Sequence, residues 1–127
     1  ELRHVDERGT LLGPLSPEDS RDRPIISGLQ GDYGRAAPSV ALPRIAYLLR
    51  RLETSHRFGE ISEVHVDAEQ GITVFPVDLR VALVLGWEDW QQKLDNAERV
   101  LATWKGREGK LGVIDLTLPG SVIVRIK

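Results

Sequence analysis

VIDLTLPGSVIVRIK, residues 113–127, is the stretch that decides the fold, because it joins two apolar, β-branched runs through Pro119-Gly120. Proline followed by glycine between apolar runs is typical of a tight turn. The stretch therefore predicts a hairpin formed by residues 110–118 and 121–127. A β-branched strand at the end of a chain is expected at a sheet edge, where unpaired N–H and C=O groups are open to another chain. This pattern favours binding over catalysis.

The last strand of this hairpin has two interpretations. Its alternation places Val122, Val124 and Ile126 on one face, and they could simply close the core. Arg125 and Lys127 on the other face would then be charges that discourage edge pairing. The alternative is that the exposed edge receives a strand from a partner.

A helix is predicted over residues 88–104, before the hairpin. Its apolar residues recur at alternating steps of four and three, which places them on one face. Glu88 and Asp89 would lie in its first turn, where carboxylates interact favourably with the helix dipole. Gly106 and Gly109 would end it. The apolar positions are Trp90, Leu94, Ala97, Leu101 and Trp104.

Three strands are predicted further upstream, over residues 61–68, 72–75 and 80–85. In the first of them, Val64 and Val66 alternate with Glu63, His65 and Asp67, which is typical of an antiparallel meander with one dry face. A helix is expected to cover that face.

A second helix is predicted to begin between Ser39 and Pro43, since serine is a good N-cap and proline is tolerated in a first turn. It carries one apolar face and one charged face. The apolar face consists of Leu42, Ile45, Leu49 and Leu52, and the charged face of Arg44, Arg50, Arg51 and Glu53.

The first third of the chain has weaker patterns. Residues 2–5 and 10–12 flank the turn formers Asp6-Glu7-Arg8-Gly9 and predict a short hairpin. Residues 13–38 are rich in proline and glycine, and we expect a long surface connection anchored by Ile25-Ile26. The whole order predicts an α+β fold, with a largely antiparallel sheet, two helices packed on one face and the last hairpin at the sheet edge.

Composition narrows the function classes. A chain of 127 residues with 41% hydrophobic residues is expected to form one domain, residues 1–127. A net charge of −2 without a basic patch disfavours nucleic acid. No apolar run reaches the roughly 18 residues that span a bilayer. The absence of cysteine excludes disulfides and thiolate zinc sites.

The sequence carries no recognisable catalytic, metal or cofactor site. Its carboxylates fall at predicted turns or helix starts, its histidines lack ligand spacing, and its serines lack a Gly-x-Ser-x-Gly motif. Gly28, Gly31 and Gly34 indicate a flexible loop rather than a dinucleotide loop. Trp87 either staples the helix start or lies exposed as a binding anchor. The residues considered were Asp6, Glu7, Asp67, Asp78, Glu88, Asp89, His4, His56, His65, Ser16, Ser27 and Ser121.

Several short motifs occur in an order that resembles the FtsQ/DivIB bacterial cell-division proteins. The resemblance covers nearly the whole chain, and the order and spacing of the motifs are more specific than any one of them. The motifs are Asp6-Glu7-Arg8-Gly9, Pro24-Ile25-Ile26-Ser27-Gly28, Leu85-Gly86 with Lys93-Leu94, Ile114-Asp115-Leu116 and the valine-rich last strand.

The resemblance implies a carboxy-terminal extracytoplasmic β-domain. A cytoplasmic tail, a single membrane helix and a POTRA domain would precede Glu1, and the missing amino-terminal methionine fits that expectation. Members of the family are not enzymes. They are scaffolds that recruit FtsB, FtsL and other divisome components at the cytoplasmic membrane, and their last strands receive a strand and a short helix from FtsB.

The resemblance also implies which residues bind the partner. Better-known members carry an Arg-aromatic pair where this chain has Thr117-Leu118, which removes a charged anchor but leaves main-chain pairing possible. Two rival functions are a small hydrolase with a carboxylate site under residues 13–38, and a peptide-binding module of outer-membrane assembly. The implied partner-binding residues are Thr117, Leu118, Gly120, Ser121, Val122, Ile123 and Val124.

Overall fold

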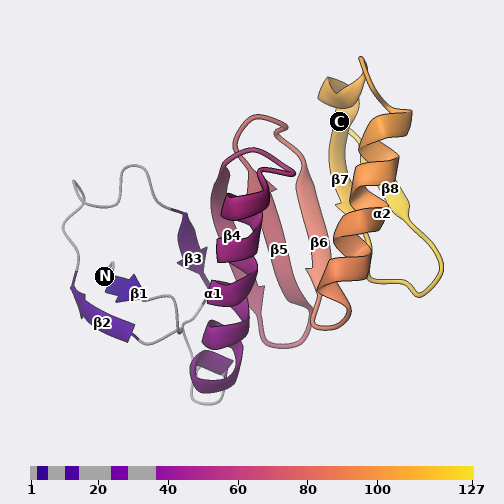
Figure 1. The fold of residues 1–127 in the computed structure, drawn as a ribbon. Coiled ribbons are helices and arrows are strands. Elements are labelled where there is room, and N and C mark those ends of the chain that lie inside the picture. Colours follow the sequence, from indigo (N-terminus) through magenta and orange to yellow (C-terminus); the bar gives the residue numbers. More distant parts are fainter. Residues whose placement is uncertain (1–2, 6–10, 15–23, 29–36) are drawn as a thin grey trace.

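A computed structural model describes residues 3–5, 11–14, 24–28 and 37–127 of the chain. The described elements form a two-stranded sheet, a six-stranded sheet and two α-helices (Figure 1). They are β1 (Arg3–Val5), β2 (Leu11–Pro14), β3 (Ile25–Ser27), α1 (Ala37–Ser55), β4 (Ile61–Asp67), β5 (Gly71–Pro76), β6 (Ala82–Gly86), α2 (Trp90–Thr103), the 3-10 helix η3 (Glu108–Lys110), β7 (Leu111–Asp115) and β8 (Ile123–Ile126).

The larger sheet has the strand order β3-β4-β5-β6-β7-β8, so sequence neighbours are also sheet neighbours. Strands β4, β5 and β6 form the predicted antiparallel meander, and β7 and β8 form the predicted hairpin. The two remaining pairs, β3-β4 and β6-β7, are parallel, because α1 and α2 carry the chain back along the sheet between them. Both helices cover the same face (Figure 1). The α+β prediction, with β8 at an edge, is confirmed.

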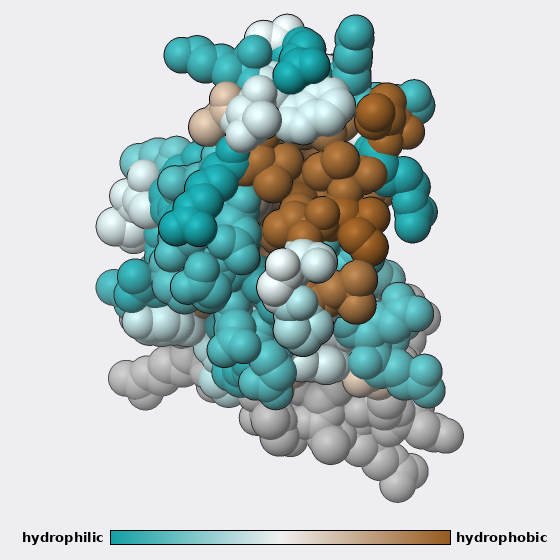
Figure 2. Space-filling model, turned by 90° about the vertical axis from the view of Figure 1, so that its right-hand side faces the viewer, coloured by the Kyte–Doolittle hydropathy of each residue, from teal (hydrophilic) through white to brown (hydrophobic). Residues whose placement is uncertain are grey.

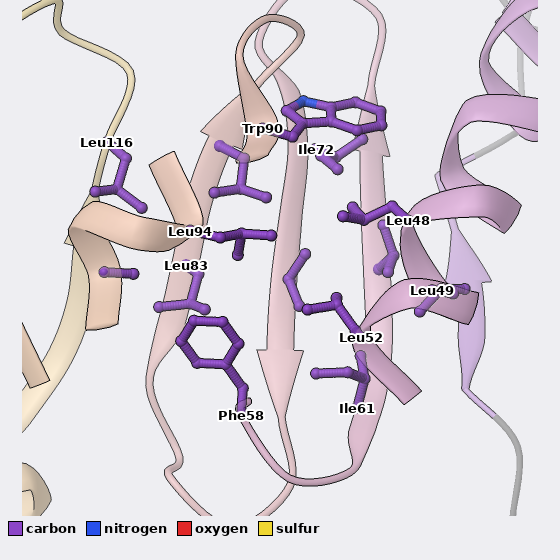
Figure 3. Close-up of a cluster of buried hydrophobic side chains, with 14 of the residues drawn as sticks. Leu48, Leu49, Leu52, Phe58, Ile61, Ile72, Leu83, Trp90, Leu94 and Leu116 are labelled. Atoms are coloured by element: carbon purple, nitrogen blue, oxygen red, sulfur yellow. The ribbon is translucent and has the colours of Figure 1, made fainter. Parts of the chain in front are cut away.

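The core lies between this sheet and the helices (Figure 3). Val64 and Val66 are buried on β4 while His65 between them is exposed, as the alternation predicts. Leu101 and Trp104 on α2 are half-buried and pack against the core. The predicted apolar helix positions Leu42, Ile45, Leu49, Leu52, Trp90, Leu94 and Ala97 are all buried.

Part of the expected long connection is a strand, so that prediction is wrong for residues 25–27. Ile25–Ser27 pairs in parallel with β4, with Ile26 opposite Val64. Three residues between turn formers carry no usable periodicity, and the partner strand is distant in sequence. The β1-β2 hairpin is confirmed, whereas its turn at residues 6–9 lies outside the described residues.

Both helix starts differ from the predictions. Helix α1 begins at Ala37, before the predicted range, so Pro43 lies inside the helix. Helix α2 begins at Trp90, so Glu88 and Asp89 precede it and no acidic residue lies in its first turn. Asp89 has a left-handed backbone, with φ 55°, and its side chain makes no capping hydrogen bond. None of the described helices combines the length and apolar character needed to cross a bilayer.

Candidate functional site

Strand β8 lies at one end of the larger sheet, with β7 as its sheet neighbour. The two strands are antiparallel, and Ile114 faces Val124 while Asp115 faces Ile123. No further strand of the described part of the chain pairs with the outer side of β8. This side is therefore an open row of main-chain donors and acceptors.

The register shows which main-chain groups face outward. The Lys127 N–H donates to the Lys110 carbonyl at 2.9 Å, so Lys127 faces the β7 side. The Arg125 carbonyl oxygen also faces β7, lying 3.4 Å from the position that a β-carbon on Gly112 would take. Successive residues of a strand present their N–H and C=O groups to alternate sides. The N–H and C=O groups of Val124 and Ile126 therefore face away from the sheet.

Hydrophobic side chains gather on the side of the molecule where β8 lies (Figure 2). Val122 and Val124 are half-buried and pack against the core. Ile123 is 47% exposed and Ile126 is 59% exposed. The interpretation that Ile126 closes the core is wrong, because it lies at the end of an edge strand that has a β-bulge opposite it, between Leu111 and Val113.

The connection between β7 and β8 is ordered by two local hydrogen-bond systems. Asp115 Oδ1 accepts from the N–H of Thr117 at 2.9 Å and from its hydroxyl at 2.6 Å. The Ser121 N–H donates to the Leu118 carbonyl at 3.3 Å across Pro119-Gly120. Gly120 has φ 72°, so this is the turn type that requires glycine at its third position. Leu118, 50% exposed, lies at the start of this turn.

The implied partner-binding residues therefore form one continuous surface, which we call the β8 edge (residues 117–124). Val122 and Val124 are its half-buried members. Main-chain groups dominate the outer side of the strand, and apolar side chains flank it. This combination suits the addition of a β-strand from another chain.

Trp87 is held by contacts that favour the staple interpretation over the exposed anchor. Its indole N–H donates to the Ala68 carbonyl at 3.0 Å, and its ring lies 6.4 Å from the Trp90 ring. Arg44 donates to the Trp87 carbonyl at 2.5 Å. The sequence placed Trp87 beside the helix start but gave no sign of the arginine from α1.

The carboxylates in the described part of the chain serve turns or lie on the surface. Asp67 Oδ1 accepts from the N–H groups of Glu69 and Gln70, both at 2.9 Å, and the Gln70 bond is the largest cause of the lowered Asp67 pKa. Asp78, Glu88 and Asp89 are exposed. No group of three His, Asp or Glu side chains suited to a metal ion occurs among the described residues.

The sequence missed a small polar cluster on β3 and β4. The Ser27 hydroxyl donates to Glu63 Oε2 at 2.5 Å and lies 2.9 Å from His65 Nδ1. Because the serine proton is used on the carboxylate, the imidazole Nδ1–H is the donor toward Oγ, which is opposite to the activation of a nucleophile. The cluster joins two paired strands, and its members come from registers that only the fold brings together.

The described surface contains two hollows, neither of which has an Asp or Glu among its described lining residues. The rival hydrolase needs two carboxylates in one pocket. Most of residues 13–38, under which that pocket was expected, lies outside the described residues. The described geometry therefore gives the hydrolase no support.

Comparison with known proteins points to one family. A family model described as "Cell division protein FtsQ/DivIB, C-terminal" matches residues 1–117. A "Cell division protein FtsQ" of Geotalea daltonii is 31% identical over 129 residues, which cover 98% of this chain and 47% of the relative. Proteins of the same name from Syntrophotalea carbinolica and Anaeromyxobacter sp. are 27% and 29% identical, covering 98% and 96% of this chain and 46% and 44% of theirs. The chain spans about half the length of the curated relatives it matches.

Proposed function

Because the chain belongs to the FtsQ/DivIB family of cell-division proteins, we propose that it is a non-enzymatic scaffold domain that recruits partners during bacterial cell division. The proposed partners are FtsB- and FtsL-like proteins and other divisome components. The partner contributes a strand that pairs with the outer side of β8. The observation that carries this proposal is the open edge at Val124 and Ile126, flanked by the exposed side chain of Ile123.

Main-chain pairing explains how the site can tolerate Thr117-Leu118 in place of an Arg-aromatic pair. In strand addition the main-chain hydrogen bonds supply affinity, and the pockets for alternate side chains supply specificity. Leu118 still offers an exposed apolar contact beside the strand. The exchange therefore changes which side chains of the partner are preferred and leaves the pairing itself intact.

A binding role also agrees with the described polar groups. Asp67 and Asp115 hold turns, and Ser27 joins two strands, so each is occupied by a structural contact. We place the domain on the extracytoplasmic side of the cytoplasmic membrane in the full-length protein. Its tether would lie in a part of the protein outside this sequence, which agrees with relatives about twice as long.

The test is calorimetry with the extracytoplasmic part of the FtsB–FtsL pair from the same organism. Val124→Pro removes an outward N–H from β8 and leaves the bonds to β7, so the variant should fold and lose most of its affinity. Val124→Thr is the matched control, because it keeps the N–H and the β-branched shape, and it should bind like the unmodified domain.

Two results would contradict the proposal. One is a folded Val124→Pro variant that binds as tightly as the Val124→Thr control. The other is no measurable binding by the unmodified domain, which would limit its relation to the family to the fold. Circular dichroism and thermal unfolding of each variant separate lost binding from lost folding.

A further inference from the structure

A hollow between the two helices has no role in the proposed strand addition. Its volume is about 440 Å³, and residues of both α1 and α2 line it. We call it the interhelix groove. Its described lining residues are Pro43, Arg44, Tyr47, Leu48, Arg51, Trp90 and Gln91.

The interhelix groove has an apolar floor and an aromatic wall. Leu48 and Trp90 are buried, 5% and 9% exposed, where they pack into the core (Figure 3). Tyr47 is 58% exposed, which is high for a large aromatic side chain on a helix that packs on a sheet. An apolar side chain from outside would therefore contact Tyr47 and the outer parts of Leu48 and Trp90.

Two arginines border the groove and are already oriented by aromatic contacts. The Arg44 guanidinium carbon lies 4.4 Å from the centre of the Trp90 ring, and its Nη2 donates to the Trp87 carbonyl. The Arg51 guanidinium carbon lies 5.7 Å from the centre of the Tyr47 ring, and its Nη1 donates to the Tyr47 hydroxyl at 3.1 Å. Each guanidinium has five N–H donors, so these contacts leave others to bind a ligand.

The charge around the groove is unbalanced. Among its described lining residues are two arginines and no carboxylate. Guanidinium groups that are held flat against rings lose less freedom on binding and suit bidentate pairing with carboxylates. The charge and the apolar floor together select a ligand that has acidic groups on both sides of an apolar side chain.

We propose that the interhelix groove binds an acidic, amphipathic segment of a partner protein. One apolar side chain of the segment fills the groove over Leu48 and Trp90, and neighbouring Asp or Glu side chains pair with Arg44 and Arg51. This site is separate from the β8 edge, because α2 packs on β6 and β7 lies between β6 and β8. A partner can therefore occupy both surfaces at once, or two partners can bind side by side.

The probe is a synthetic peptide of about four helical turns, with leucines on one face and glutamates on the flanking positions. A peptide with every glutamate replaced by glutamine is its control. The readout is the set of indole N–H signals in a nitrogen–proton NMR spectrum. The Trp90 indole is fixed by a 2.9 Å bond to the Gly86 carbonyl, so its signal should shift, whereas the Trp104 signal should not.

Arg51→Glu should weaken binding of the acidic peptide about tenfold, because a charge pair becomes a like-charge contact. Arg107→Glu is the matched control and should bind normally. Arg107 also stacks on an aromatic ring, with 4.8 Å to the centre of Trp104, but it lies outside the groove. Added salt should weaken binding of the acidic peptide and leave the glutamine peptide unaffected.

The proposal is wrong if the acidic peptide shows no saturable shift of Trp90 at concentrations up to about 1 mM, the weak limit for a specific contact. It is equally wrong if Arg51→Glu and Arg107→Glu bind alike, or if the glutamine peptide binds as tightly. Val124→Pro should bind this peptide normally, so a failure of the groove and a failure of the β8 edge would be seen in different experiments.

Discussion

Gly71 shows how strictly one residue can be determined by its neighbours. It has φ 92°, and a β-carbon there would lie 2.1 Å from the carbonyl carbon of Gly86 on the neighbouring strand. Because the obstacle is backbone in the middle of the sheet, it cannot move aside. We expect Gly71→Ala to lower the free energy of unfolding by about 3 kcal/mol, which combines left-handed strain with overpacking. Urea denaturation followed by circular dichroism measures the loss.

Gly106→Ala is the control for the strain alone. Gly106 has a similar φ of 88°, but no heavy atom lies within 4 Å of the β-carbon position. The expected loss is about 1 kcal/mol. Equal losses at the two glycines would show that the close approach of Gly86 contributes nothing.

At the scale of elements, periodic patterns predicted well and contact between distant segments did not. Val64 and Val66 revealed β4, and the steps from Trp90 to Leu94 and Ala97 revealed α2, because one residue out of phase would expose the core face. Strand β3 is too short to show a period. The groups of β8 that face outward depend on pairing with β7, which no single strand encodes. The interhelix groove needs two helices at once.

A pair of proline substitutions tests the register of β8. Arg125→Pro removes a donor that faces β7, so we expect the free energy of unfolding to fall by about 3 kcal/mol. Val124→Pro removes a donor that faces outward, and the loss should be about 1 kcal/mol, since an edge strand tolerates proline there. Thermal and urea unfolding of both variants decide the order. If Val124→Pro proves the more damaging change, the outward groups of β8 belong to the other set of residues.

At the scale of the whole molecule, one arginine links the two halves of the larger sheet. Arg57 follows α1 and donates to Glu98 and, at 2.6 Å, to Asp95, both on α2. These bonds, above all the one to Glu98, raise the Arg57 pKa, so the guanidinium stays charged wherever the protein folds. The arginine side chain is 20% exposed and the two carboxylate side chains are 46% exposed. Solvent therefore screens the pairs, and each should contribute modestly.

A double-mutant cycle of Arg57→Ala and Glu98→Ala measures that contribution. We expect a coupling free energy of about 0.5 to 1 kcal/mol, reduced by added salt as in other partly exposed pairs. Replacing Glu53 by alanine in the cycle should give no coupling, because Glu53 is exposed on α1 and makes no ion pair that the described contacts include. If Arg57 and Glu98 prove additive, the apolar core beneath them, and not this pair, holds α2 against the end of α1.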